Sequence, residues 1–234
     1  MGKLVLGGNI KGGVGKSTTL NLLACVTKDS ILYNIDQTQS VESVNSGGYS
    51  VDLIDEDIDI PNAVKSGLED YEYIFLDTPS NFKPGQEDYE RIISVLDQVD
   101  LFLIPLKTGN RSVEATLTTL DMLFGRGTTA RTRPVKLLFI LNDIVSTGLK
   151  EDTLKKAKEY VHKNIIEELN NIEFTVEIEK IYIDYFMHSK AIEKLEDEDI
   201  TMDKLYESNR GGYRVINSKI NEISKNIIEI LKKG

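Results

Sequence analysis

The chain has 234 residues, of which 40% are hydrophobic and 28% are charged, and its formal net charge is −10. This balance is typical of a globular protein, and the negative charge argues against indiscriminate nucleic-acid binding by the monomer as a whole. A single cysteine, Cys25, excludes an intrachain disulfide and a multi-cysteine metal site, which favours a cytoplasmic location. No apolar stretch approaches the roughly 20 residues that a membrane-spanning helix needs.

A glycine-rich loop follows the first predicted strand, residues 4–6, and leads into the first predicted helix. The loop reads Gly12-Gly13-Val14-Gly15-Lys16-Ser17-Thr18. Glycines let the backbone wrap a polyphosphate, and the N–H groups at the helix N-terminus point partial positive charge at phosphate oxygens. Lys16 would bind the β- and γ-phosphates, and the Ser17 hydroxyl would bind Mg²⁺. The loop therefore predicts a nucleotide-binding site.

The second predicted strand, residues 31–35, is followed by Asp36. An acid at the carboxyl end of a strand beside a phosphate-binding loop can orient the water that attacks the terminal phosphate. The alternative is an aspartate that ends the strand and caps the next turn.

A third buried strand, residues 73–76, is followed by Asp77. Such a strand delivers its terminal carboxylate to the carboxyl edge of the sheet, where Asp77 can hold Mg²⁺, commonly through a water. Together with the glycine-rich loop, this spacing predicts a magnesium site. The strand and the residues after it resemble a Walker B strand and a second switch region, and this resemblance implies that the segment 78–80 senses the γ-phosphate.

The rest of the chain continues to alternate between strand and helix patterns. Further strands are predicted at 101–104 and 135–141, with edge strands near 51–54 and 178–183. Helical periodicity is found around 89–96, 113–124, 154–165 and 216–230. This alternation predicts an α/β fold, a mostly parallel twisted sheet with helices on both faces, as in P-loop NTPases. No linker or repeat interrupts it, so we expect one domain over residues 1–234.

Asn142 follows the predicted strand at 135–141. At that position an amide could pair with the edge of the adenine base. An ordinary loop asparagine after a strand is the other interpretation, and the sequence does not decide between them.

The segment from Lys11 to Thr18 resembles the deviant Walker A loop of the ParA/MinD family of dimerising ATPases. The resemblance implies that ATP and Mg²⁺ are bound and that Lys11 reaches across a homodimer interface to the partner's phosphates. In the register of the family's first switch region that keeps Ser40, Asn34 replaces the first aspartate and Asp36 is the second, which the family ties to hydrolysis. A rival register makes Asp36 the first aspartate.

The whole chain looks most like the small plasmid-partition ATPases of the ParF type, from the acidic-aromatic segment 70–73 and from a loop within a dozen residues of Met1. This resemblance implies a slow ATPase that is stimulated by a partner. Its ATP-bound homodimer would bind DNA without sequence preference and associate with the nucleoid. The partner would be a small centromere-binding, ParB-like adaptor.

Local basic groups must supply any DNA contact in so acidic a chain. The candidate set is Arg210, Arg214 and Lys219, close to the Gly-Gly corner at 211–212. The competing interpretation is that these are solvated charges at a helix start. A second basic group comprises Arg126, Arg131 and Arg133, which we expect at the sheet edge away from the nucleotide.

The alternative function is a MinD-like membrane-cycling ATPase that positions another protein complex. It would need an amphipathic C-terminal helix, and isoleucines do recur at helical spacing over 216–230. Glu222, Glu229 and the lack of an aromatic anchor argue against insertion into a bilayer. We therefore expect no stable membrane association. The other interpretations are that these isoleucines pack on the sheet or pair with the same helix of a second subunit.

Overall fold

Within the described residues, 2–35, 50–53, 59–128, 131–144, 150–187 and 212–233, the computed structural model has a seven-stranded sheet. The strands are β1 (Lys3–Gly7), β2 (Ser30–Asn34), β3 (Ser50–Leu53), β4 (Tyr73–Asp77), β5 (Leu101–Leu106), β6 (Val135–Ile144) and β7 (Ile178–Met187). Their spatial order is β3-β2-β4-β1-β5-β6-β7, and each neighbouring pair is parallel. The predicted α/β class is confirmed, and the two expected edge strands do lie at the edges.

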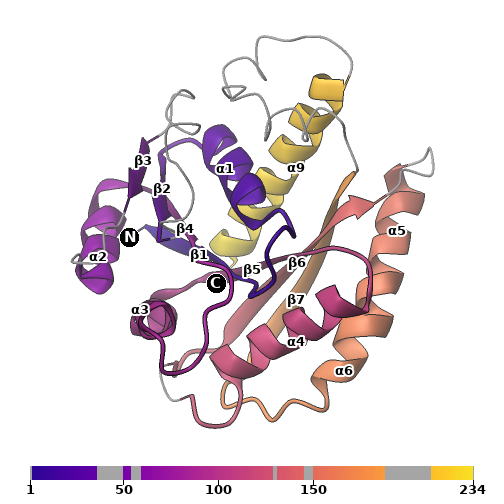
Figure 1. Cartoon of the computed structure of the whole chain (residues 1–234). Coiled ribbons are helices and arrows are strands. Elements are labelled where there is room, and N and C mark those ends of the chain that lie inside the picture. Colours follow the sequence, from indigo (N-terminus) through magenta and orange to yellow (C-terminus); the bar gives the residue numbers. More distant parts are fainter. Residues whose placement is uncertain are drawn as a thin grey trace.

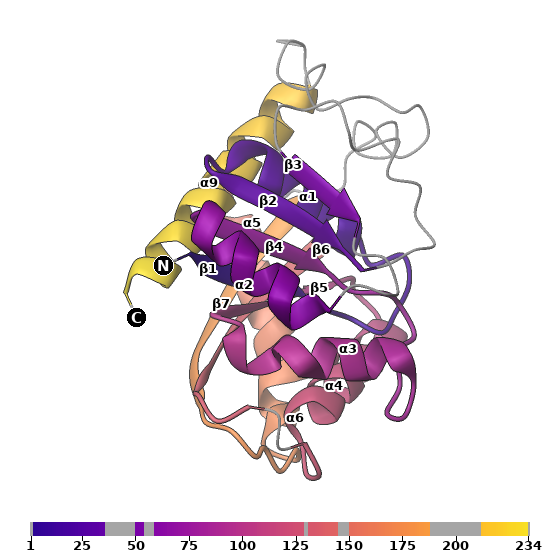
Figure 2. The same ribbon diagram turned by 90° about the vertical axis from the view of Figure 1, so that its left-hand side faces the viewer.

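The described helices cover both faces of the sheet (Figures 1 and 2). They are α1 (Lys16–Val26), α2 (Ile60–Asp70), α3 (Glu87–Val95), α4 (Asn110–Phe124), α5 (Lys150–Val161), α6 (Glu167–Leu169) and α9 (Gly212–Lys232). A 3₁₀ turn (Leu96–Gln98) extends α3, and a π-helical turn (His162–Ile166) joins α5 to α6. That residues 1–234 form one domain stays a prediction.

The sheet divides the interior into two hydrophobic clusters. Leu4 and Leu6 of β1 face the cluster under α2, α3, α4 and α5, whereas Val5 faces the cluster under α1 and α9. Alternate side chains of a strand point to opposite faces, and both faces here are covered, so the strands are continuous apolar runs. β5 is buried along its whole length.

Helix α2 was not predicted, although the sequence does carry its start signal. The Asp59 side chain accepts a hydrogen bond from the Asn62 backbone N–H at 3.3 Å, and a proline occupies the first turn. Both are ordinary features of a helix start. Ile60, Val64 and Gly67 are buried, and Ala63 and Leu68 pack partly buried against the same cluster. Small residues make up much of this apolar face, which explains why its periodicity was missed.

The C-terminal helix α9 packs along the same face of the sheet as α1. Its apolar stripe, Ile216, Ile220, Ile223, Ile227 and Ile230, is at most 6% exposed. The Thr27 hydroxyl after α1 lies 2.8 Å from the Ser224 hydroxyl of α9. The stripe is therefore used in the core, as the sheet-packing interpretation predicts.

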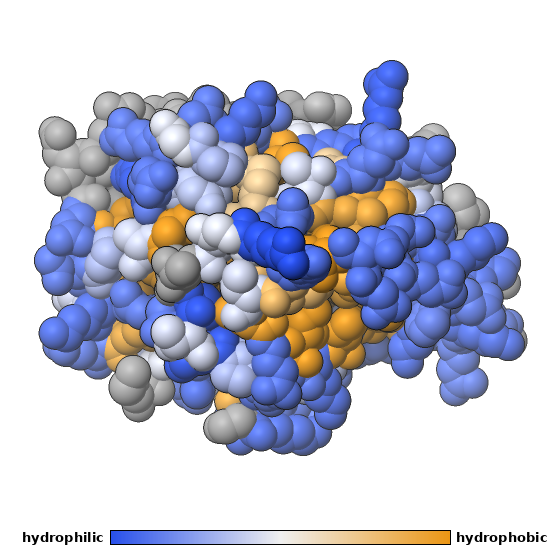
Figure 3. Space-filling model, turned by 90° about the horizontal axis from the view of Figure 1, so that it is seen from below, coloured by the Kyte–Doolittle hydropathy of each residue, from blue (hydrophilic) through white to orange (hydrophobic). Residues whose placement is uncertain are grey.

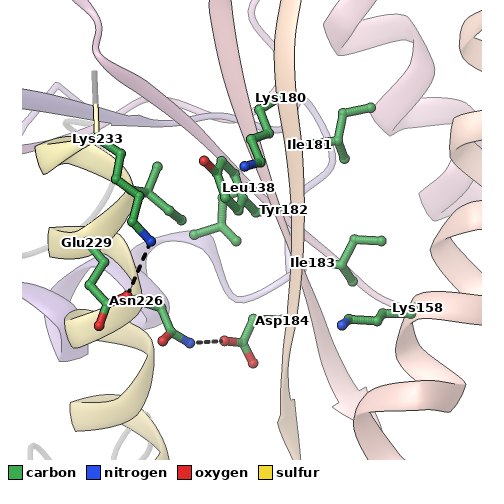
Figure 4. Close-up of a pocket in the computed structure, with 11 residues that line it drawn as sticks. Leu138, Lys158, Lys180, Ile181, Tyr182, Ile183, Asp184, Asn226, Glu229 and Lys233 are labelled. Atoms are coloured by element: carbon green, nitrogen blue, oxygen red, sulfur yellow. Dashed lines mark hydrogen bonds and ion pairs between the residues drawn. The ribbon is translucent and has the colours of Figure 1, made fainter.

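Buried charges attach α9 to β7. The Lys219 ammonium lies 2.5 Å from an Asp184 carboxylate oxygen, and both side chains are at most 7% exposed. The same ammonium reaches Glu222 at 3.2 Å and stacks over the Tyr185 ring at 4.1 Å. Figure 4 shows the Asn226 amide of α9 turned toward Asp184, to which it donates at 3.1 Å.

Lys219 was predicted to contact DNA, and this assignment is wrong. Its charge is buried and already neutralised by acids of β7 and α9, so it cannot reach a phosphate backbone without breaking the attachment of the helix.

Seen from below, the molecule shows an apolar area framed by hydrophilic side chains (Figure 3). Val215, 50% exposed, is the one large hydrophobic side chain that the described part of the chain leaves largely open to solvent. The apolar area therefore consists of side chains that are partly covered by their neighbours.

We predict that Lys219→Ala lowers the free energy of unfolding by about 3 kcal/mol, because it leaves Asp184 buried without its counter-ion. Urea denaturation measures this change. Lys225→Ala, an exposed position on the same helix, is the matched control and should change stability by less than about 0.5 kcal/mol. Equal stability of the two variants would contradict the buried attachment.

Candidate nucleotide-binding site

The loop between β1 and α1 owes its shape to two glycines. Gly13 has φ +71° and Gly15 has φ +82°, and both values lie in the left-handed region that side-chain-bearing residues rarely adopt. Gly15 also caps α1, so the unpaired N–H groups of the first helical turn begin directly after it. This backbone suits the binding of an anion.

A buried asparagine fastens the front of the loop. The Asn9 amide donates to the Pro105 carbonyl at 2.9 Å and to the Thr116 hydroxyl at 3.1 Å. Its side-chain oxygen accepts from the Lys11 backbone N–H at 2.9 Å. The loop is thus fixed to β5 and α4 at the point where Lys11 leaves it. Asn9 had no predicted role, because an asparagine in a glycine-rich loop has no signature of its own.

Lys16 and Asp77 meet at the carboxyl edge of the sheet. The Lys16 ammonium lies 2.6 Å from an Asp77 carboxylate oxygen, with the side chains 5% and 1% exposed. The ammonium also donates to the Thr78 carbonyl. Asp77 ends the interior strand β4, in register with Gly7 of β1 and Asn34 of β2. The structure thereby brings together two of the predicted site residues, which lie 61 positions apart.

The segment after β4 rests on the loop. The Thr78 hydroxyl donates to the Gly7 carbonyl at 2.9 Å, and the Asn81 backbone N–H donates to the Ile10 carbonyl at 3.0 Å. Asn81 holds a positive φ of 66° in doing so. A rearrangement of the loop would therefore act directly on residues 78–81.

The remaining predicted residues lie in the loop and in the first turn of α1. Gly12 and Gly13 are exposed, Val14 is buried, and Lys11, Ser17 and Thr18 are partly exposed. Among the described residues no ion pair is found for the Lys11 ammonium.

These residues fit a nucleotide with Mg²⁺. Lys16 offers a cation inside the glycine turn, and the Asp77 carboxylate with the Ser17 hydroxyl offers the hard oxygen ligands that Mg²⁺ prefers. The cation and the carboxylate neutralise each other in this structure, so a polyphosphate and Mg²⁺ would each replace one partner of an existing pair.

Asn142 lies against the loop. Its side chain is 7% exposed, and its amide donates to the Val14 carbonyl at 2.6 Å. The contact of Asn142 with the adenine base stays a prediction.

Asp36 and Arg210 lie outside the described residues. Arg214 is exposed in the first turn of α9.

Arg131, from the second basic group, is a structural residue. Its guanidinium donates to the carbonyls of Leu96, Val99, Arg133 and Pro134 at 2.6 to 2.9 Å. Burial lowers the pKa of Arg131 to about 10, which still leaves it charged at neutral pH. It is therefore unavailable for DNA.

No protein-family model and no curated protein sequence matches the chain. Solved structures do match. A pNOB8 ParA structure bound to nonspecific DNA has a TM-score of 0.59 at 16% identity, over 100% of this chain and 99% of that one. The MinC:MinD cell division complex of Aquifex aeolicus gives 0.57 at 15%, over 97% and 96%. A putative plasmid partition protein of Borrelia burgdorferi bound to AMPPNP gives 0.54 at 17%, over 100% and 99%. The chain thus has the fold of ParA and MinD proteins.

We predict that Lys16→Met weakens binding of a fluorescent ATP analogue by about a hundredfold, because two or more charge-assisted hydrogen bonds to phosphate are lost. Lys28→Met, exposed beyond the end of α1, is the control and should bind normally. Since the variant leaves Asp77 without its counter-ion, Lys16→Met/Asp77→Asn removes both charges and separates folding from binding. A folded double variant with unaltered affinity would contradict the site.

Proposed function

We propose that the chain is an ATPase of the DNA-partition type, which dimerises on binding ATP and then binds DNA without sequence preference. The observation that carries the proposal is the buried pair of Lys16 and Asp77 at the mouth of a left-handed glycine turn. A cation within an anion-binding backbone, beside a carboxylate at a strand end, is the arrangement that phosphoryl transfer requires. The nucleotide analogue bound to the Borrelia protein is consistent with it.

Each residue has a separate task in this proposal. Backbone N–H groups of Gly13 to Ser17 bind the phosphates, and Lys16 turns from Asp77 to the β- and γ-phosphate oxygens. Asp77 and the Ser17 hydroxyl hold Mg²⁺, which when bound neutralises phosphate charge. Asp36 orients the attacking water, and Lys11 of each subunit reaches the phosphates bound by the other.

The loop gives Lys11 a suitable starting point. Its backbone is fixed through the Asn9 side chain, while its own side chain is partly exposed. A lysine whose backbone is held this way can extend its ammonium group toward a partner subunit without disturbing the loop. This supports a role across an ATP-dependent homodimer interface.

DNA is the proposed ligand of the ATP-bound dimer, as it is the ligand of pNOB8 ParA in the structure that matches. With Lys219 buried, the proposed contacts reduce to Arg214 and Arg210. A dimer would present two copies of each arginine, so DNA contact would depend on local positive charge in subunits that each have a net charge of −10. A ParB-like adaptor would stimulate hydrolysis and thereby release the DNA.

The MinD-like membrane function has less support. The five isoleucines that would enter a bilayer are buried against the sheet, so α9 would have to detach before it could bind a membrane surface. Among the described helices, none has the length and apolarity that crossing a bilayer requires.

Lys11→Ala should keep ATP binding within about twofold and lose ATP-dependent dimerisation and hydrolysis, whereas Lys16→Ala should lose all three. Light scattering with size-exclusion chromatography, with and without ATP, measures the dimer. Lys83→Ala, an exposed lysine after β4, should behave as wild type. Similar losses of nucleotide affinity in the Lys11 and Lys16 variants would remove the case for Lys11 acting on the partner subunit.

Unrelated DNA duplexes should bind the ATP form with similar affinity and the ADP form weakly. Affinity should fall by about 0.9 log units per log unit of salt for each phosphate neutralised. Arg210→Glu/Arg214→Glu should abolish retention and spare the dimer, while Lys225→Glu, exposed on the same helix, serves as control. Unchanged retention in the double variant would refute this surface, and no ATP-dependent binding at low salt would refute the partition function.

A further inference from the structure

Asn142 reaches the nucleotide loop from a distant strand. It lies near the carboxyl end of β6, and β5 separates β6 from β1, where the loop begins. Its amide nitrogen lies 2.6 Å from the Val14 carbonyl oxygen and 3.5 Å from the Thr19 hydroxyl. All three residues are at most 7% exposed. The amide therefore braces the loop and the first turn of α1 from inside the protein.

This contact determines how one peptide group of the loop is oriented. In a planar trans peptide, the carbonyl of one residue and the N–H of the next point in opposite directions. When Asn142 holds the Val14 carbonyl, the Gly15 N–H is directed to the side of the loop away from Asn142. A fixed carbonyl at residue 14 thus fixes a donor at residue 15.

Gly15 is fitted to the same amide. A Cβ atom on Gly15 would lie 2.8 Å from the Asn142 amide nitrogen, and the φ of +82° disfavours a side chain independently. The amide therefore packs directly against the Gly15 backbone. Two observations, a hydrogen bond on Val14 and a steric contact on Gly15, place Asn142 behind the same peptide group.

We propose that Asn142 is a positioning residue, which holds the Val14 carbonyl so that the Gly15 N–H faces the phosphates of a bound nucleotide. The inference rests on the proposed nucleotide site, and it assigns Asn142 to the phosphate end of the ligand. A contact with adenine would instead make the effect of Asn142 depend on the base of the nucleotide.

Binding of three ligands with Mg²⁺ separates these roles: ATP, GTP and inorganic tripolyphosphate, which has no base. In Asn142→Ala, titration calorimetry should show all three weakened by a similar factor, about tenfold, with the ATP-to-GTP ratio unchanged. Asn142→Leu retains side-chain bulk without a donor and should lose the same amount, which distinguishes the lost hydrogen bond from a cavity. Asn170→Ala, an exposed asparagine after α6, is the control.

The free protein supplies a second readout. Hydrogen exchange of the peptide covering residues 9–20 should be faster in both Asn142 variants without any ligand, while the melting temperature of at least one stays near that of wild type. If the Asn142 variants lose affinity for ATP alone and still bind tripolyphosphate as the wild type does, the inference is overturned in favour of a contact with the base. Unchanged binding of all three ligands would also overturn it. If the wild type binds none of them, the proposed function itself fails.

Discussion

The arrangement of the site depends on an ion pair that is buried before any ligand arrives. Removing one charge from water costs several kcal/mol, so neither Lys16 nor Asp77 could occupy this position alone. Their pairing fixes the first turn of α1 over the end of β4 and joins the loop to the segment that starts at Thr78. On binding, the phosphates would take the place of Asp77 beside Lys16, and Mg²⁺ would take the place of Lys16 beside Asp77. Neither side chain would be left as an isolated buried charge.

Much of the fold could be read from the sequence because both faces of the sheet are covered. Strands such as β5 are then continuous apolar runs, and the helices between them show their period plainly. Helix α2 was missed because small residues such as Ala63 and Gly67 make up much of its core-facing side and give a weak apolar pattern. The loop residues were predictable for another reason: glycines, a lysine and a serine at fixed spacing have few other uses.

What the sequence could not give was the partner of each polar side chain. Lys219 has a basic neighbourhood in the sequence, but Asp184, which faces it, lies 35 positions away on β7. An isolated basic residue gives no sign of whether it is solvated or paired. Asn9 and Asn142 raise the same difficulty, since an asparagine after a strand can bond a ligand, a loop or water. Only the packing of β5, β6 and α4 around the loop distinguishes these cases.

The pairing of α1 with α9 has a consequence for the order in which the protein is made. Synthesis delivers the loop and α1 near the start, whereas α9 follows about two hundred residues later. Until then the apolar side of α1 lacks the isoleucines that cover it and the Ser224 hydroxyl that bonds Thr27. A nascent chain that lacks α9 therefore leaves this surface of α1 exposed to water.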